Sequence, residues 1–209
     1  MVKIDQTGAP ERDTARRARP LPPGERRAAI VAATIPLLRQ HGTDVSTRQI
    51  AEAAGIAEGT IFRVFPDKES LIQAALEDAF DPTSTIELLD AINRSHSLDD
   101  RVTAAVRILQ TRISQVSQLM MAVRLHVPPD DAQGLREKAQ ARTEQVHKAL
   151  IRVLEPDRDQ LRVPPTEAAR VLRLLVFAGS HPLITDGRPM TTRQVVTVLL
   201  DGVRNREGN

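Results

Sequence analysis

The side chains best suited to act on another molecule lie between residues 46 and 71, in the segment STRQIAEAAGIAEGTIFRVFPDKESL. This segment combines hydroxyl, guanidinium and ammonium groups with glycines and short apolar runs. Such donors, placed at the starts of short helices, are suited to hydrogen bonds with the phosphates and base edges of duplex DNA. The chemistry that they favour is therefore recognition of DNA.

Two short helices joined by a tight turn are predicted to position these groups. Ser46 and Gln49 have the spacing of a capping box, so a helix is expected to begin at Thr47. Gly55 can adopt the left-handed conformation that a helix end often needs, and a second helix is expected over residues 58–64. The pattern is typical of a helix-turn-helix, whose second helix enters the major groove.

A helix in the major groove presents its first turn to the bases, while its flanks meet phosphates. Arg63 can make a bidentate contact to guanine, worth about 1–3 kcal/mol of discrimination. Thr60 can meet a base edge, a thymine methyl or a phosphate, and Gly59 lets the backbone approach closely. Thr47 and Arg48 open the preceding helix, whose N-terminus favours an anion. The second helix is thus predicted to present five residues to DNA: Glu58, Gly59, Thr60, Phe62 and Arg63.

After the second short helix the chain continues with a run that is specific to one family. The run FPDKE at residues 65–69, and then Leu71, follow GTIF at residues 59–62. With these offsets, residues 26–72 resemble the DNA-binding domain of the tetracycline-repressor (TetR) family of bacterial regulators. The rest of the chain is similar to the family only in its length and in its all-helical sequence pattern. The resemblance implies that Lys68, at the start of the next helix, binds a phosphate.

Some of these residues also have ordinary structural explanations or depart from the family. Arg48 and Lys68 can be solvated surface charges. Phe62 replaces a Tyr whose hydroxyl binds phosphate, so it packs either on sugar and thymine methyl groups or in the core. Ala57 lacks the capping oxygen of Ser or Thr, at a cost of about 1 kcal/mol, and Val64 replaces an aromatic residue or His. These departures concern operator identity and contact detail.

Composition restricts the other classes of function. The chain of 209 residues is 41% apolar and has no Cys, Tyr or Trp, which excludes disulfides, thiolate catalysis and cysteine-ligated zinc. With four Phe, stacking of single-stranded bases on several aromatics is not expected. Five His occur without a metal-binding spacing, and no catalytic or phosphate-loop motif is present, so we expect neither a cofactor nor an enzyme. No apolar run matches a membrane span or a signal peptide, so we expect a cytoplasmic protein.

Positive charge is concentrated toward the N-terminus, where the helix-turn-helix lies. Residues 1–68 hold 11 Lys and Arg against 8 Asp and Glu, although the whole chain has a net charge of only +2. Residues 1–24 are rich in proline and lack apolar periodicity, and they are predicted to be a basic arm that either reaches DNA or is a solvated tail. The arm carries a cluster of four arginines: Arg12, Arg16, Arg17 and Arg19.

Apolar periodicity predicts an all-α fold with no strands and no repeats. A helix-turn-helix domain is expected over residues 25–70 and an effector-binding and dimerisation domain over residues 71–205. Pro36 is expected to kink the first helix near residues 32–36. The segment from 155 to 165 is expected to be a polar loop. The predicted helices span residues 25–41, 47–54, 58–64, 68–80, 84–93, 98–127, 131–154, 166–178 and 192–204.

The helices near residues 166–178 and 192–204 carry more apolar surface than one domain hides, which favours a second copy as a partner. In the family these two helices form a four-helix dimer interface, and the alternative is a self-contained core pair. The middle helices, over residues 67–154, are expected to hold a small apolar or amphipathic effector. Its candidate lining residues, each of which can instead be core filling, are Leu88, Leu109, Arg112, Ile113, Val116, Met120, Arg124 and His147.

The resemblance and the residues together predict a transcriptional regulator. We expect a dimeric repressor that binds a pseudo-palindromic operator in double-stranded DNA and is released by a small molecule. Two alternatives remain open at this point. One is a helical ligand-binding or interaction protein with a degenerate helix-turn-helix, and the other is an enzyme with a pocket in the middle helices.

Overall fold

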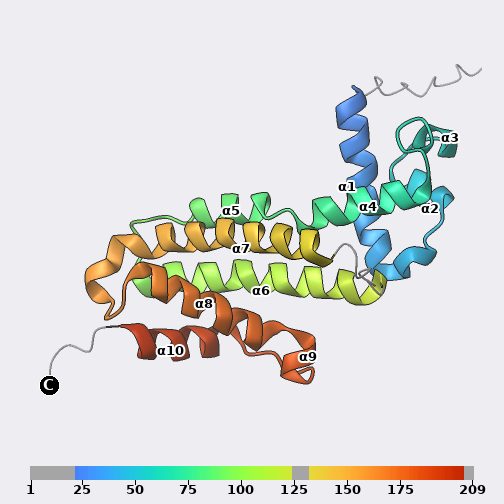
Figure 1. The fold of residues 1–209 in the computed structure, drawn as a ribbon. Helices are drawn as coiled ribbons and strands as arrows, with labels where there is room; N and C mark the ends of the chain where they lie inside the picture. The colour runs from blue at the N-terminus through green and yellow to red at the C-terminus, as the bar shows by residue number, and fades with distance from the viewer. Residues whose placement is uncertain (1–21, 124–131, 205–209) are drawn as a thin grey trace, which may run out of the picture.

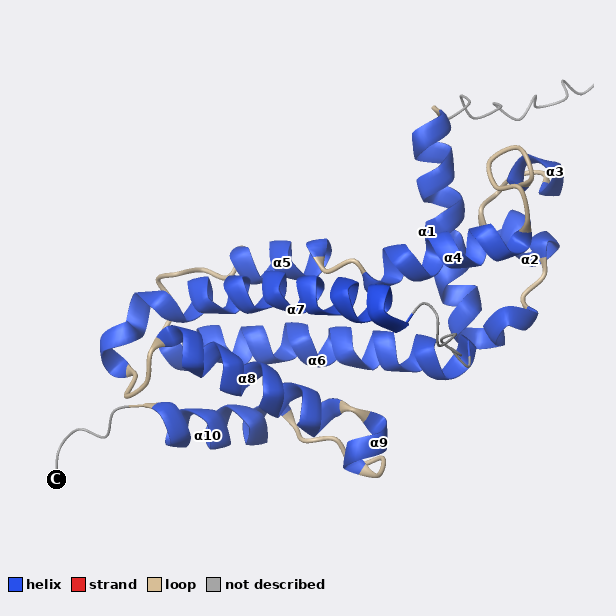
Figure 2. Cartoon of the chain, in the orientation of Figure 1, coloured by secondary structure: helices blue, strands red, loops and turns tan. Residues whose placement is uncertain are grey.

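Helices make up nearly all of the regular structure (Figure 2). The computed structural model describes residues 22–123 and 132–204. Over these two ranges it contains no strand, and an isolated antiparallel bridge joins Leu161 to Arg204. The predicted all-α class is therefore confirmed. None of the described helices is both long enough and apolar enough to cross a membrane.

An N-terminal unit contains the predicted helix-turn-helix. Its apolar faces share one core, in which Ile30, Leu38, Ile50, Ile61 and Phe65 are at most 1% exposed. Leu119 and Val123, from the end of a later helix, are buried in this same core. The elements of the unit are α1 (Pro23–His41), η1 (Gly42–Asp44), α2 (Thr47–Ala53), α3 (Glu58–Ile61) and α4 (Lys68–Phe80).

A larger helical unit follows. Figure 1 shows α5, α6 and α7 running along a common direction, with α1 standing across the end of α6. Val102, Val106, Leu150, Leu172 and Leu199 lie at the centre of the second core. The elements of this unit are α5 (Thr83–Asp90), α6 (Leu98–Val123), α7 (Ala132–Leu154), η3 (Glu155–Gln160), α8 (Pro165–Ser180), α9 (Pro182–Thr185) and α10 (Thr192–Val203).

Local capping signals predicted several helix boundaries correctly. The carboxylate of Asp67 accepts the backbone N–H of Ser70 at 2.7 Å, and α4 begins at the next residue, Lys68. The same helix ends at Phe80, because Pro82 disfavours helical geometry at Asp81. Such signals work because the hydrogen bonds join residues that are close in sequence.

Two segments differ from the prediction. Residues 155–160 form the 3-10 helix η3 instead of a loop, because the buried Arg101 forms an ion pair with Asp157 and binds the carbonyl oxygen of Val153 at 3.1 Å. The four-residue helix α9 was not predicted, and α5 ends three residues before the predicted end at residue 93. Short helices of this kind depend on tertiary contacts that periodicity does not reveal.

Pro36 lies inside α1 and does not end it, since the helix continues to His41. The hydroxyl of Thr34, two residues earlier, donates to the carbonyl oxygen of Ile30 at 2.8 Å. A kink near residues 32–36 stays a prediction, as does the domain boundary between residues 70 and 71. The arginine cluster of the arm, Arg124 of the predicted effector pocket, and the prolines at 128 and 129 lie outside the described residues.

Candidate nucleic-acid interface and effector cavity

The turn between α2 and α3 forms as its sequence predicts. The hydroxyl oxygen of Ser46 accepts the N–H of Gln49 at 3.2 Å, and the amide oxygen of Gln49 accepts the N–H of Ser46 at 2.8 Å. Gly55 has a φ of 66°, a left-handed conformation that costs glycine little. The N–H of Ile56 then donates to the carbonyl oxygen of Ala51 at 3.0 Å and closes the turn.

The second helix is shorter than predicted. It spans Glu58–Ile61 instead of residues 58–64, and no side chain caps its start at Ala57. After Ile61 the backbone tightens, because the N–H of Val64 bonds the carbonyl oxygen of Ile61 at 2.9 Å, three residues back. Pro66 disfavours helical geometry at Phe65, which is buried in the core. Arg63 therefore lies on a turn just after α3.

The predicted DNA-contacting residues lie at the surface of this unit or partly buried in it. Phe62 is 51% exposed, which excludes its interpretation as a core residue. Its role on DNA, like that of the other seven, stays a prediction. Five of the eight residues are exposed and three are half-buried: Arg48, Glu58, Gly59, Phe62 and Arg63, then Thr47, Thr60 and Lys68.

Two hydrogen bonds hold the starts of these helices in place. The hydroxyl of Thr47 donates to a carboxylate oxygen of Glu58 at 2.5 Å, which joins the start of α2 to the start of α3. The ammonium group of Lys68 donates to the carbonyl oxygen of Thr43 at 2.7 Å, which joins the start of α4 to η1. Thr43 was not predicted, because every residue offers a backbone acceptor and its sequence carries no signal. The arrangement leaves two of the three N–H donors of Lys68 for another acceptor.

A further cation lies beside this unit. The guanidinium of Arg27, in the first two turns of α1, stacks over the ring of Phe65 at 4.3 Å from its centroid. Sequence reasoning did not single out Arg27 among the arginines of residues 1–68. The cation–π contact ties the start of α1 to the segment that follows α3.

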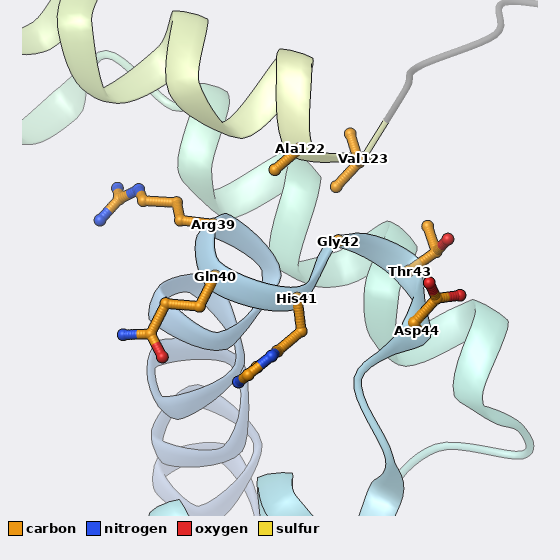
Figure 3. A pocket seen from close by; sticks show the side chains of 8 residues that line it. All are labelled: Arg39, Gln40, His41, Gly42, Thr43, Asp44, Ala122 and Val123. Carbon is orange, nitrogen blue, oxygen red and sulfur yellow. The ribbon is translucent and has the colours of Figure 1, made fainter.

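The end of α6 meets the N-terminal unit at η1. Gly42 has a φ of 60°, and a Cβ placed on it would lie 2.4 Å from the carbonyl oxygen of Ala122. Figure 3 shows the end of α1, η1 and the last described residues of α6 around a hollow at this junction. Because Val123 is also buried in the N-terminal core, α6 is held against the unit that carries the candidate DNA contacts.

A cavity of about 200 Å³ lies in the larger unit, beside the end of α4. Three of the eight predicted pocket residues line it: Leu109, Arg112 and Ile113. Leu88 and Met120 are instead 57% and 43% exposed. Val116 and His147 are half-buried but do not line this cavity. The remaining lining residues are Phe80, Pro82, Thr85, Arg142, Thr143, Val146, Arg173 and Phe177.

Apolar side chains and guanidinium groups together line the cavity. Arg112 donates to the backbone carbonyl oxygen of Asp81, just after α4, at 3.0 Å. Burial lowers the pKa of Arg112, and the nearby Asp81 carboxylate opposes that change. Arg142 lies over the ring of Phe80 at 5.8 Å from its centroid. Within the described ranges, no group of three His, Asp or Glu side chains is placed to hold a metal ion.

The C-terminal helices expose a group of large apolar side chains, which we call the α8–α10 patch. Its members are Leu174 and Phe177 of α8, Leu183 and Ile184 of α9, and Val198 of α10, each at least 45% exposed. The opposite faces of α8 and α10 are fully buried at Leu172 and Val195. These helices therefore have apolar residues on their outer surface as well as in the core, as the sequence predicted.

Comparison with known proteins places the N-terminal unit in a described family. The sequence model described as "Bacterial regulatory proteins, tetR family" matches residues 30–75. The HTH-type transcriptional regulator BetI of Klebsiella pneumoniae (strain 342) is 36% identical over 77 residues, which cover 36% of this chain and 37% of BetI. The chain thus matches little more than a third of that relative's length.

Solved structures resemble nearly the whole chain. The SmeT–triclosan complex has a TM-score of 0.58 and 19% identity, covering 88% of this chain and 93% of SmeT. SmeT is the repressor of the Stenotrophomonas maltophilia multidrug efflux pump SmeDEF. A transcriptional regulator from Rhodococcus sp. Rha1 has a TM-score of 0.57 and 19% identity, covering 86% of this chain and 98% of that one. At these identities the likeness shows the fold.

Proposed function

Because the chain belongs to the TetR family of bacterial regulatory proteins, we propose that it binds an operator in double-stranded DNA as a homodimer and represses transcription until a small molecule releases it. The observation that carries this proposal is the helix-turn-helix, whose second helix and following turn expose Gly59, Phe62 and Arg63. Such a regulator acts on the bacterial chromosome, so we place it in the cytoplasm. Family membership also points to a regulator rather than an enzyme.

Three cations suit the phosphates and base edges of DNA. Arg63 is exposed on the turn after α3, where its planar guanidinium can bind guanine through two hydrogen bonds. Arg48 lies in the first turn of α2, and Lys68 has two N–H donors left for a phosphate. Glu58 repels phosphate, and its hydrogen bond from Thr47 holds the carboxylate against α2. We therefore assign base reading to Arg63 and phosphate binding to Arg48 and Lys68.

The α8–α10 patch supports a homodimer. Five large apolar side chains are exposed on α8, α9 and α10, and α8 packs against both other helices. A monomer rarely leaves a large apolar surface open to water. A two-fold dimer would carry two recognition helices to half-sites about 34–36 Å apart, one turn of DNA. Phe177 belongs both to this patch and to the cavity lining, so a partner seated on the patch would lie beside a bound ligand.

Helix α4 provides a physical connection between ligand and DNA. Its 13 residues span about 20 Å, from Lys68 in the candidate DNA interface to Phe80 in the cavity lining. Arg112 in the cavity binds the carbonyl oxygen of Asp81, immediately after this helix. A ligand that prefers a different position of α4 would shift the population of conformers and move the recognition helices. DNA and ligand would then weaken each other's binding reciprocally.

Two substitutions test the assigned DNA contacts. Arg63→Ala is expected to cost about 1–3 kcal/mol on the preferred duplex and little on random DNA. Lys68→Ala is expected to weaken both duplexes and to lower the slope of log affinity against log salt by about one unit. Fluorescence anisotropy at several salt concentrations measures both effects. If the two variants changed preferred and random DNA in the same way, the assignment of roles would be wrong.

A charge in the α8–α10 patch tests the dimer. Leu174→Glu or Val198→Glu is expected to convert the dimer to a monomer, because the carboxylate would be desolvated at the interface. Sedimentation velocity measures the change. Met121→Glu is the matched control, since Met121 is 59% exposed near the end of α6 and away from the patch. A dimer that persists in both patch variants would rule out this interface.

A further inference from the structure

The cavity beside α4 is lined by more positive charge than its surroundings compensate. Three guanidinium groups line it, from Arg112 of α6, Arg142 of α7 and Arg173 of α8, and none of its lining residues is acidic. Arginine keeps its charge in proteins, so these are three permanent cations around about 200 Å³. Like charges held this close repel one another unless an anion lies between them.

The nearest carboxylate compensates two of these cations only in part. Asp81 lies close enough to Arg112 and Arg142 to affect both, yet its carboxylate accepts from the backbone N–H of Thr83 at 2.8 Å and from the hydroxyl of Thr83 at 2.6 Å. Arg112 reaches the backbone carbonyl of Asp81 rather than its carboxylate. Asp78 acts on Arg112 more weakly than Asp81 does. Within the described ranges, neither carboxylate forms an ion pair with Arg112 or Arg142.

Arg173 is the least compensated of the three. Its Nε is buried and has no hydrogen-bond partner, and none of the described carboxylates forms an ion pair with it. A buried donor without a partner costs free energy, so an acceptor bound at this position would stabilise Arg173. Arg142 is less suited to this role, because it also borders a surface hollow beside Asp78 and Asp81. Arg112 and Arg173 are therefore the principal candidates to hold an anion.

The rest of the lining is suited to an apolar body. Its aromatic and aliphatic members are Phe80, Pro82, Leu109, Ile113, Val146 and Phe177. The hydroxyls of Thr85 and Thr143 add two groups that can donate or accept hydrogen bonds. A volume of about 200 Å³ is small for a ligand site, which suits a small organic acid rather than a long lipid.

We propose that the effector bound in this cavity is a small organic carboxylate, whose negative group is held by Arg112 and Arg173 and whose apolar body packs against the aromatic and aliphatic lining. This inference rests on the proposed function, since it names the class of ligand that would release the regulator. An anion competing for Arg112 would weaken its hydrogen bond to Asp81 and so loosen the end of α4. Through the hydrogen bond between Arg112 and Asp81, binding of an anionic ligand would change the position of α4 and so of the DNA-binding unit.

Calorimetric titration of the full chain tests the ligand class. Hexanoate and benzoate are the probes, with hexanol and benzyl alcohol as neutral analogues, and hexylamine and benzylamine as cationic ones. The carboxylates are expected to bind about tenfold or more tightly than the alcohols, because hydrogen bonds to charged groups are the stronger ones, and the amines are expected not to bind. Equal or tighter binding of the alcohols or amines overturns the proposal, and so does the absence of carboxylate binding at millimolar concentration.

Matched variants test the two arginines. Arg112→Gln and Arg173→Gln are each expected to weaken benzoate about tenfold or more, while Arg173→Lys, which keeps the charge, retains part of the affinity. Arg107→Gln is the control, because Arg107 is exposed on the same helix as Arg112 and does not line the cavity. Circular dichroism shows whether each variant is folded. Unchanged benzoate affinity in folded Arg112→Gln and Arg173→Gln contradicts the proposal.

DNA binding separates this inference from the proposed function. Selection of duplexes from a random pool is carried out with unliganded protein. If a duplex is enriched and no carboxylate binds, the proposed ligand class is wrong and the proposed function as a DNA-binding regulator is supported. If a carboxylate binds in the cavity and no duplex is enriched, the proposed carboxylate site is supported and the proposed function is wrong.

Discussion

The junction between η1 and α6 provides a prediction whose magnitude follows from the geometry. Gly42 has φ 60° and ψ −145°, a backbone conformation that is nearly restricted to glycine. A Cβ there would lie 2.4 Å from the backbone carbonyl oxygen of Ala122, where no flexible side chain can move aside. Gly42→Ala must therefore either strain the backbone or push η1 away from the end of α6.

These two effects set the expected cost of Gly42→Ala. Backbone strain of this kind costs about 1–3 kcal/mol, and inserting a methyl group into a tightly packed contact costs about 1–3 kcal/mol more. The sum is about 2–6 kcal/mol. In a chain of this size, 1 kcal/mol corresponds to about 2–4 °C in Tm. Gly42→Ala is thus expected to lower the Tm by about 4–24 °C.

Thermal unfolding followed by circular dichroism measures this change, with Gly202→Ala as the control. Gly202 lies inside α10, and a Cβ there meets nothing within 4 Å. Alanine in a helix interior is expected to leave the stability unchanged or to raise it by up to about 1 kcal/mol. A Gly42→Ala protein with the same Tm as the wild type would refute the reasoning, because η1 could not then be packed on α6 as described.

Three further predictions concern single side chains. Gly59→Ala is expected to keep or raise the Tm, since a Cβ there meets nothing within 4 Å, while it lowers DNA affinity at the protein–DNA contact; unchanged anisotropy titrations would remove Gly59 from the interface. Arg101→Met is expected to cost about 3–5 kcal/mol in urea unfolding, because it leaves the partly buried Asp157 unpaired; a loss below about 1 kcal/mol would contradict the role of this ion pair. The guanidinium of Arg152 donates to the carboxylate of Asp90 at 2.9 and 2.8 Å and holds the pKa of Asp90 below its usual value. The ion pair therefore stabilises the folded chain above the unfolded pKa of about 3.9, and this stabilisation is lost as the pH falls through the folded pKa. Asp90→Asn is expected to cost about 0.2–1 kcal/mol at neutral pH, a difference that shrinks in acid, and a loss independent of pH would exclude this origin.

Local signals explain why much of the N-terminal unit was predictable. The capping box at Ser46 and the Asp67 cap each join residues three apart, and Gly55 takes the positive φ that its place in the turn required. The length of α3 was predicted wrongly, because local signals at its two ends were not taken into account. Ala57 gives its start no cap, and Pro66 restricts the residue before it, so the helix stops at Ile61.

Long-range contacts explain what the sequence did not reveal. Periodicity indicates which residues share a helix face, but it does not say where along that face a cavity lies. Arg112 therefore lines the cavity, whereas Met120, two turns further along α6, is exposed. The packing of Gly42 on Ala122 and the bond from Lys68 to Thr43 join segments that are distant in sequence, and neither has a sequence signature.

The most direct test of the proposed function is selection of bound duplexes from a random DNA pool, with the affinity of the enriched duplexes measured against salt. We predict a two-fold symmetric site, with half-sites one turn of DNA apart and a steep salt dependence. No enrichment, with only weak and salt-sensitive binding, would contradict the account. The helix-turn-helix would then be a scaffold in a ligand-binding or interaction protein.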